Sequence, residues 1–382
     1  MIRIRKGKIT RVLEMWPGGR EVEVLVEGKK ERAVSFDLLT GPALPGQQVI
    51  LNTTAVYKGL GTGGTHFVMA IPSLPGKEAG EAGHIMKLRY TPFQVKVLAV
   101  EEEDHPLNHL YRATRSLDGT PVVIASLHSA LGPVAAVVHK LTGGKFRLVY
   151  VMTEGGALPL ALSKLVAELK QKGLLQATVT CGHSFGGDYE AVNIYSGLLA
   201  ARGVAGADVI VAAPGPGIAG TGDEFGNTAI ELGELVNAVN VLKGKPVAVP
   251  RVSFADPRER HKGLSHHTRT ALGKIALSSC TVVFPEMTSG KKALLARQLL
   301  ASKIAARHRV VYLDAALTAD ALREYSLEVT TMGRNFEQDK EFFLAAGAAG
   351  IFAVISRKET TKTGFVKPIG NALRRGIFQG VL

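Results

Sequence analysis

The chain has 382 residues, 46% of them hydrophobic and 21% charged, so it can bury a sizeable core and is not a disordered polymer. It holds only two cysteines, Cys181 and Cys280, which excludes a disulfide-stapled scaffold and fits a reducing compartment. The N-terminus lacks the apolar run of a signal peptide, and no stretch approaches the roughly 20 apolar residues of a membrane span. We therefore expect a cytoplasmic protein that does not enter a membrane.

The formal net charge of +13 is concentrated in two segments. Residues 251–310 carry 12 lysines and arginines against 3 acidic residues, and residues 357–382 carry 6 against 1. Such an excess indicates an anionic partner, either nucleic acid or a phosphorylated metabolite. The alternative is that these charges only solvate helix surfaces.

Short β-branched runs separated by turn residues predict a small all-β domain over residues 1–72. The five expected strands are 7–15, 20–26, 32–36, 47–56 and 65–71. Their number and spacing favour a partly open barrel of the oligonucleotide-binding or SH3-like kind. Such barrels bind single strands by stacking aromatic residues on bases. The sparse aromatic residues here form no stacking pattern, so docking onto the rest of the chain is the preferred role. Residues 73–86 are the expected linker.

From residue 87 to residue 356, apolar strands alternate with amphipathic helices. The expected strands are 94–100, 121–127, 146–152, 177–181, 208–213, 246–254, 280–284, 309–313 and 327–331, and helices are expected at 158–172, 188–202, 228–242, 291–307 and 337–355. Strands made of consecutive apolar residues are buried on both faces of their sheet. We therefore predict an α/β domain with a mostly parallel sheet and helices on both faces. Ligands of such sheets bind at the carboxyl ends of the strands. Residues 357–382 form a basic C-terminal extension.

A glycine-rich loop follows the strand expected at 208–213. Gly215, Gly217 and Gly220 match the G-x-G-x-x-G pattern, in which glycines let the backbone approach a phosphate at a helix start. The match to a dinucleotide site is incomplete, because the helix begins late and the candidate acid Asp256 lies about 36 rather than roughly 20 residues further on. We expect a phosphate or carboxylate site instead, with ligands from Gly215, Gly217, Gly220, Thr221, Gly222 and Asn227.

A competing hypothesis is nucleophilic catalysis. Residues 182–186 read G-x-S-x-G between an expected strand and an expected helix, which is the context in which Ser184 would act as a nucleophile. His128 and Asp256 follow the strands where the oxyanion amides and the triad acid would lie. However, no histidine follows the strand at 280–284, where the general base should be. The alternative is a glycine-rich turn that only allows tight packing.

Metal binding is the third hypothesis. His261, His266 and His267 lie close together in the sequence, but adjacent histidines and this gap are not a standard zinc spacing. Asp188, Asp223, Asp256 and His261 form an alternative set that suits Mg²⁺ or Mn²⁺. Neither pattern decides for a metal, and we assign no metal ligands.

Several motifs together carry a family resemblance. They are Leu38-Leu39-Thr40-Gly41, Pro45-Gly46, Leu51-Asn52-Thr53-Thr54-Ala55-Val56, Leu60-Gly61-Thr62-Gly63-Gly64, and the later stretches 182–187 and 214–227. With these the chain resembles a bacterial family of uncharacterised proteins, known only as a domain of unknown function. The resemblance covers nearly the whole chain. It implies no activity, cofactor or catalytic residue.

We therefore predict a protein that binds an anionic, phosphate-bearing small molecule at the carboxyl edge of the sheet, near loops 182–188, 214–227 and 256–269. Glu154, Arg260, His261 and Arg269 are the further ligand-binding candidates, and Arg334 is a further cation at this edge. If the site performs chemistry, His183, Asp223 and Asp256 are the acid–base candidates. The alternatives are a serine hydrolase with Ser184 as nucleophile, and a non-catalytic module that binds nucleic acid or protein. Whether the chain is an enzyme, which cofactor it uses and how it oligomerises stay open.

Overall fold

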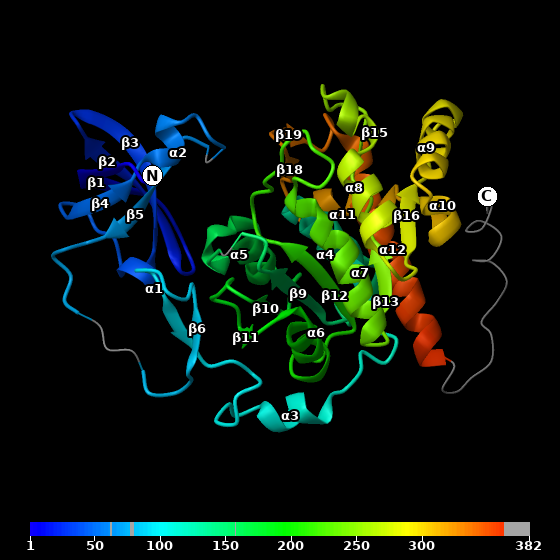
Figure 1. Ribbon diagram of the computed structural model, residues 1–382, viewed down its shortest axis with the longest axis horizontal. Helices are drawn as coiled ribbons and strands as arrows, with labels where there is room; N and C mark the ends of the chain where they lie inside the picture. The colour runs from blue at the N-terminus through cyan, green and yellow to red at the C-terminus, as the bar shows by residue number, and fades with distance from the viewer. Residues whose placement is uncertain (62, 77–79, 157, 363–382) are drawn as a thin grey trace.

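The structure is a computed structural model that describes residues 1–61, 63–76, 80–156 and 158–362. Its N-terminal part is a closed five-stranded barrel in the order β1-β2-β3-β5-β4 (Figure 1). The strands are β1 (Ile4–Trp16), β2 (Gly19–Val26), β3 (Lys29–Phe36), β4 (Gln48–Asn52) and β5 (Thr65–Ala70), with the short helices α1 (Asp37–Thr40) and α2 (Thr54–Tyr57) between them. Alternate residues point inwards, so Val22, Val24 and Val26 share one small core. The predicted all-β barrel is confirmed, and it is closed rather than open.

The larger part is built on a parallel eight-stranded sheet in the order β11-β10-β9-β12-β8-β13-β16-β17. Its strands are β8 (Pro121–Ile124), β9 (Leu148–Thr153), β10 (Ala177–Cys181), β11 (Tyr189–Ala191), β12 (Val209–Pro214), β13 (Lys245–Ala248), β16 (Thr281–Pro285) and β17 (Arg309–Leu313). The central strands are fully buried, as their continuous apolar runs indicate. The predicted α/β class with a mostly parallel sheet is therefore confirmed.

Helices cover both faces of this sheet. On one face lie α4 (Leu131–Thr142), α5 (Lys164–Gln171), α11 (Leu317–Glu324) and α12 (Lys340–Lys362). On the other lie α6 (Ile194–Gly203), α7 (Glu231–Val241), α9 (Ser289–Ala301), α10 (Ile304–Arg307) and a π-helical turn at Ala271–Ile275. Each set encloses its own apolar cluster against the sheet.

Smaller elements complete the chain. Among the described residues, three two-stranded pairs lie outside the main sheet: β6 (Ile85–Lys87) with β7 (Val95–Val97), β14 (Val252–Ser253) with β15 (Gly263–Leu264), and β18 (Thr330–Thr331) with β19 (Arg334–Asn335). The helices α3 (Asn108–Ala113) and α8 (His266–Thr270) are short, and single 3₁₀ turns lie at His128–Ala130, Leu160–Leu162, Thr228–Ile230 and Glu259–His261. The strand expected at 94–100 thus exists only in part, as β7 and a single parallel bridge of Ala99 to Glu190 of β11 at the edge of the main sheet. The strand expected at 327–331 is reduced to β18, which pairs with β19 instead of the main sheet.

A cavity of about 410 Å³ lies at the carboxyl edge of the sheet, lined in part by His128 after β8 and Gly217 after β12. The neighbours β8 and β12 are followed by α4 and α7, which pack in the cores of opposite faces. Where neighbouring strands send their helices to opposite faces, the loops separate and leave room for a ligand. The glycine-rich loop after β12 therefore begins at a position that parallel sheets commonly use for binding.

The barrel contacts the larger part through α5 and the turn before it. The indole Nε1 of Trp16 donates to the carbonyl of Ala161 at 2.5 Å, and Nζ of Lys164 lies 4.6 Å from the Trp16 ring centre. Lys164 also pairs with Glu14 at 2.6 Å and Glu21 at 3.2 Å. A cavity of about 1060 Å³ lies beside this contact and is lined by both parts of the chain.

The predicted C-terminal extension begins inside α12, which continues from Lys340 to Lys362. The rest of that extension, residues 363–382, lies outside the described residues. Within the described ranges, no helix combines the length and apolar character needed to cross a bilayer.

Candidate functional site

The glycine-rich loop after β12 is mostly exposed and holds its own shape. Gly215 is buried, and a Cβ there would lie 3.0 Å from Sδ of Met152, so any other residue would push the Met152 side chain of β9 aside. Further along, Oδ1 of Asp223 accepts from the amides of Phe225 and Gly226 at 2.8 and 3.0 Å. Asp223 is thus an exposed turn former, and one of its two carboxylate oxygens is bonded to its own loop.

The end of that loop reaches the histidines of α8. Gly220 pairs with Asn227, and a Cβ on Gly220 would lie 3.5 Å from Nε2 of His267. Asn227 is buried, and its Nδ2 donates to the Glu224 carbonyl at 3.0 Å while its Oδ1 has no hydrogen-bond partner. Loops 214–227 and 256–269 therefore come together, as the sequence predicts for loops at the same sheet edge.

Asp256 lies among guanidinium groups. Its carboxylate accepts from Arg258 at 2.9 and 2.8 Å, and Arg251 and Arg334 lie 3.4 and 3.5 Å away. Burial alone would raise the pKa of Asp256, but the hydrogen bonds and charge of Arg258 outweigh it and hold that pKa well below its ordinary value. A carboxylate that stays ionised in this way is a poor general base at neutral pH. Its geometry is that of a counter-ion, unlike the acid–base role expected from its place after a strand.

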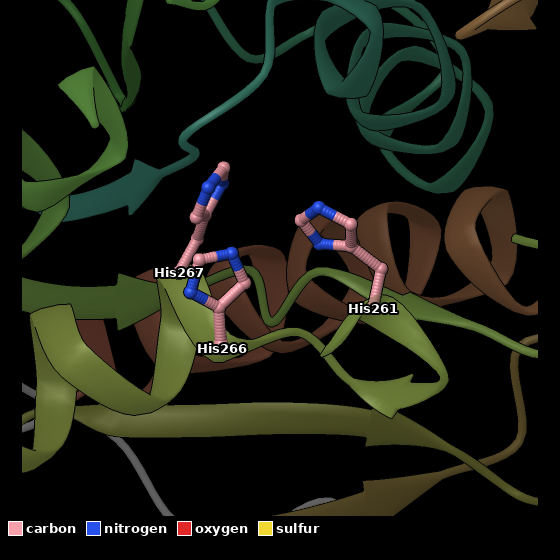
Figure 2. Close-up of side chains that lie close together, drawn as sticks. All are labelled: His261, His266 and His267. Atoms are coloured by element: carbon pink, nitrogen blue, oxygen red, sulfur yellow. The ribbon is translucent and has the colours of Figure 1, made fainter. Parts of the chain in front are cut away.

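Three histidines gather beside this ion cluster. One ring nitrogen from each of His261, His266 and His267 lies within 4.8 Å of the others (Figure 2). Burial, with the charges of Arg251 and Arg258, lowers the pKa of His261 to about 3. Burial and the neighbouring His266 likewise lower the pKa of His267 to about 3. The rings are therefore neutral at physiological pH, which is the form that binds metal ions.

A basic pocket of about 580 Å³ runs along α8 next to these rings. It is lined by Gly222, Glu224, Arg260, His266, Arg269, Thr270, Gly273, Lys274, Ala301, Ser302 and Lys303. Lys274 pairs with Glu224 at 2.7 Å. Within the described part of the chain, Arg260, Arg269 and Lys303 have no carboxylate within ion-pair distance, so the pocket carries uncompensated positive charge. Three candidates from the sequence, Gly222, Arg260 and Arg269, are among its lining residues.

Loop 182–188 lies elsewhere along the edge. The amide of His183 donates to Glu154 at 3.2 Å, and Nδ1 of His183 accepts from the amide of Leu88 at 2.9 Å. No hydrogen bond or ion pair between described residues joins this loop to 256–269. His183 and Glu154 are therefore placed together, but apart from the histidines and the basic pocket.

The hydroxyl of Ser184 is not set up as a nucleophile. Ser184 is 1% exposed, and its Oγ donates to the Thr153 carbonyl at 2.7 Å. Its own carbonyl accepts from Nζ of the buried Lys87 at 2.7 Å. Among the described residues no histidine hydrogen-bonds to the hydroxyl, and Asp256 contacts arginines instead. The serine hydrolase hypothesis lacks both an exposed hydroxyl and a base, and the glycine-rich turn acts here in packing.

The carboxylate set considered for Mg²⁺ or Mn²⁺ is not assembled. Asp188 accepts from the backbone amide of Thr178 at 2.8 Å and pairs with Lys170 at 2.5 Å, beside β10. Asp223 shapes its own turn and Asp256 neutralises arginines. Of the residues in that set, only His261 takes part in the cluster that could hold a metal.

A comparison with protein families matches residues 32–350 to the proteins of unknown function DUF3866. The chain belongs to this family. This confirms the resemblance seen in its motifs, and the family carries no assigned activity. No curated protein matches the chain.

Two solved structures give weak matches. They are described as an FPGS–AMPPCP complex and a point mutant of L. casei FPGS, with TM-scores of 0.29 and 0.28 and 11% identity to each. Each match covers 67% of this DUF3866 chain. The chain spans 63% of the first FPGS chain and 62% of the second, which is less than two thirds of either. A likeness this weak carries no argument about function.

Sequence patterns do not single out Lys274, Lys303 or Glu231 as site residues, whereas His128 is expected at this edge from its place after a strand. Lys274 and Lys303 line the basic pocket, but Lys274 joins Arg269 there through the π-helical turn, which no sequence signal announces. Glu231, at the start of α7, has a pKa raised to about 7, chiefly by burial. His128 follows β8 and bonds Tyr150 and Ser163 at 3.1 and 2.6 Å. Only His128 had a visible signal, its place directly after a buried strand.

Proposed function

We propose that this DUF3866 protein binds an anionic, phosphate-bearing small molecule in the basic pocket along α8. The observation that carries the proposal is the charge of the lining: four cations, Arg260, Arg269, Lys274 and Lys303, face one carboxylate, Glu224. Cations gathered around a cavity without matching carboxylates attract anions, and clefts focus that attraction. The volume of about 580 Å³ suits a small metabolite.

Arg269 is the best placed of these groups. It is half-buried, and its Nε is buried without a hydrogen-bond partner. A buried donor left unsatisfied costs about 1–3 kcal/mol, which a phosphate oxygen would recover. Charge-assisted bonds of guanidinium to phosphate are also short and directional. The glycine-rich loop adds Gly222 to the same wall, so it contributes to the pocket without identifying the ligand.

The cytoplasm is the location we propose, supported by two cysteines that are both buried and free. The proposal concerns binding and names no reaction.

Calorimetric titration with inorganic pyrophosphate tests the proposal. We expect Arg269→Gln and Lys303→Gln each to weaken binding roughly tenfold or more, since a hydrogen bond to a charged group contributes about 1.5–3 kcal/mol. Arg323→Gln is the matched control, because Arg323 is exposed on α11 and pairs with Asp320 away from the pocket. The proposal is overturned if pyrophosphate does not bind the wild-type chain, or if the pocket variants bind it as well as the control does.

A further inference from the structure

The local fold brings the rings of three histidines together. His261 ends a 3₁₀ turn, β15 follows and pairs with β14, and α8 then begins at His266. This reversal returns His261 to the two histidines at the start of α8. The ring centres of His266 and His267 lie 4.3 Å apart. The ring centre of His261 lies 5.0 Å from that of His266 and 4.9 Å from that of His267. Figure 2 shows the three side chains converging on one space.

We propose that His261, His266 and His267 bind one divalent transition-metal ion. Their candidate ligand nitrogens already lie within 4.8 Å of one another. In a tetrahedral site with metal–nitrogen bonds of about 2.0–2.1 Å, ligand nitrogens are about 3.4 Å apart. Side-chain rotations that move each nitrogen by about an ångström would therefore close the site around an ion, with no change in the backbone.

Two of the rings have a nitrogen free for the ion. Nδ1 of His261 is bonded to Oγ of Ser265 at 2.7 Å, which fixes the ring and leaves Nε2 as the ligand. Bonding of the second ring nitrogen to a neighbouring group is the usual arrangement in metal sites. Nε2 of His266 is buried and has no hydrogen-bond partner. A buried polar atom in that state needs an explanation, and a bound ion supplies one.

The third ring must exchange a partner. Arg251 contacts Nδ1 of His267 at 3.3 Å, a long contact in which the guanidinium is the donor. When a metal takes Nε2, the ring proton moves to Nδ1 and Arg251 has to turn away. Asp256, 3.4 Å from Arg251, then holds the freed guanidinium. The ion pair with Asp256 thus makes the exchange feasible inside a buried cluster.

The ligand set and its surroundings define the class of ion. Three imidazoles without a carboxylate suit Zn²⁺, Co²⁺, Ni²⁺ or Cu²⁺, and not Mg²⁺ or Ca²⁺. Three ligands leave at least one coordination position open. The nearby cations, which include Arg258 and Arg260, disfavour a dication alone and favour one that binds together with an anion. His266 also lines the basic pocket, so the open position lies beside the anion site, and this last point rests on the proposed function.

Co²⁺ and Zn²⁺ titrations of tag-free, chelator-treated protein test the site. We expect one equivalent of Co²⁺ to bind and to give the ligand-field absorption of a tetrahedral ion. His261→Gln and His266→Gln should weaken binding by more than the roughly 10–100-fold that loss of an outer-shell partner costs. His109→Gln is the control, because His109 is exposed on α3. Circular dichroism checks that each variant is folded. Substoichiometric binding by wild-type protein, or equal affinity in all three folded variants, overturns the proposal.

Inorganic phosphate separates this inference from the proposed function. If the open position faces the pocket, phosphate shifts the Co²⁺ spectrum of wild-type protein, and Arg269→Gln removes the shift while Co²⁺ still binds. Co²⁺ binding with no phosphate effect upholds the metal site and overturns its link to the pocket. Phosphate binding with no metal binding overturns the metal site and leaves the proposed function standing.

Discussion

Arg258 binds Asp256 through two parallel hydrogen bonds, with Nε 2.9 Å from Oδ1 and Nη2 2.8 Å from Oδ2. The same carboxylate also faces Arg251 and Arg334, so Asp256→Asn would leave three guanidinium groups around a neutral amide. Removing one partner of a buried ion pair is strongly destabilising. We expect this variant to lower the free energy of unfolding by about 3 kcal/mol, measured by urea denaturation at neutral pH.

The control for that measurement is Asp320→Asn, which removes an exposed pair with Arg323 and should cost under about 1 kcal/mol. If Asp256→Asn were as stable as this control, Asp256 would not be the counter-ion of the cluster, and its role as an acid–base group would have to be reconsidered.

Ser184 should not react as a nucleophile. Its hydroxyl is buried and donates to the Thr153 carbonyl, so neither a base nor a substrate reaches it. We expect a fluorophosphonate probe to label wild-type protein and Ser184→Ala at the same background level. The substitution should cost about 1 kcal/mol of stability, the usual contribution of one buried hydrogen bond. Labelling that is strong in wild-type protein and absent from the variant would instead support the hydrolase hypothesis.

Glu231 should make stability depend on pH. Burial, with the nearby carboxylates Glu234 and Glu154, raises its pKa from 4.5 to about 7. The folded state therefore prefers the protonated form. The stability that protonated Glu231 contributes to the folded state is fully present below about pH 4.5. It is lost as the pH rises through 7, because the carboxyl group ionises at lower pH in the unfolded chain than in the folded state.

Glu231→Gln stays neutral at every pH, so it should become more stable than wild-type protein as pH rises. We expect a gain of about 2–3 kcal/mol at pH 8 that shrinks towards zero at pH 5, from urea denaturation at both values. Glu328→Gln is the control, because Glu328 is exposed and is not among the groups that shift the pKa of Glu231. A difference between Glu231→Gln and wild-type protein that is the same at both pH values would refute the raised pKa.

Trp16 should fix the barrel against α5. Its indole donates to the Ala161 carbonyl and lies under the Lys164 ammonium group. We expect Trp16→Ala to increase the radius of gyration in small-angle X-ray scattering while each part stays folded, because contacts between parts of a chain are smaller than their cores. Tyr57→Ala, at an exposed site on the barrel, should change nothing. Identical scattering from all three proteins would mean that Trp16 does not hold the barrel in place.

The class of fold could be predicted because it depends on local patterns. Continuous Val/Ile/Ala runs such as 209–213 mark strands buried on both faces, and short alternating runs mark the barrel. The exceptions are short or polar segments. β11, with the sequence Tyr189-Glu190-Ala191, lies at the sheet edge, where the sequence pattern predicts the start of a helix. β7 pairs with β6 instead of joining the main sheet, and no local pattern specifies the choice of partner strand.

The site was predictable only in outline. The joining of loops 214–227 and 256–269 follows from the rule that parallel strands end at one edge. The role of Asp256 does not, because one of its arginines, Arg334, comes from a distant hairpin. The histidine cluster also depends on tertiary structure, since the β14–β15 pair returns His261 to α8. The spacing of the three histidines along the chain does not indicate that their rings lie close together.

The π-helical turn Ala271–Ile275 sets which cations share the basic pocket. Its characteristic bond joins the amide of Ala276 to the carbonyl of Ala271 at 2.9 Å, five residues apart instead of four. Such a turn is an α-helix with one residue inserted. Deleting one residue between Ala271 and Gly273 would restore the α-helix and rotate Lys274 by about 100° relative to Arg269. The pocket is therefore sensitive to chain length as well as to side-chain chemistry, and a relative that lacks this single residue would keep every arginine here yet present a differently charged cavity.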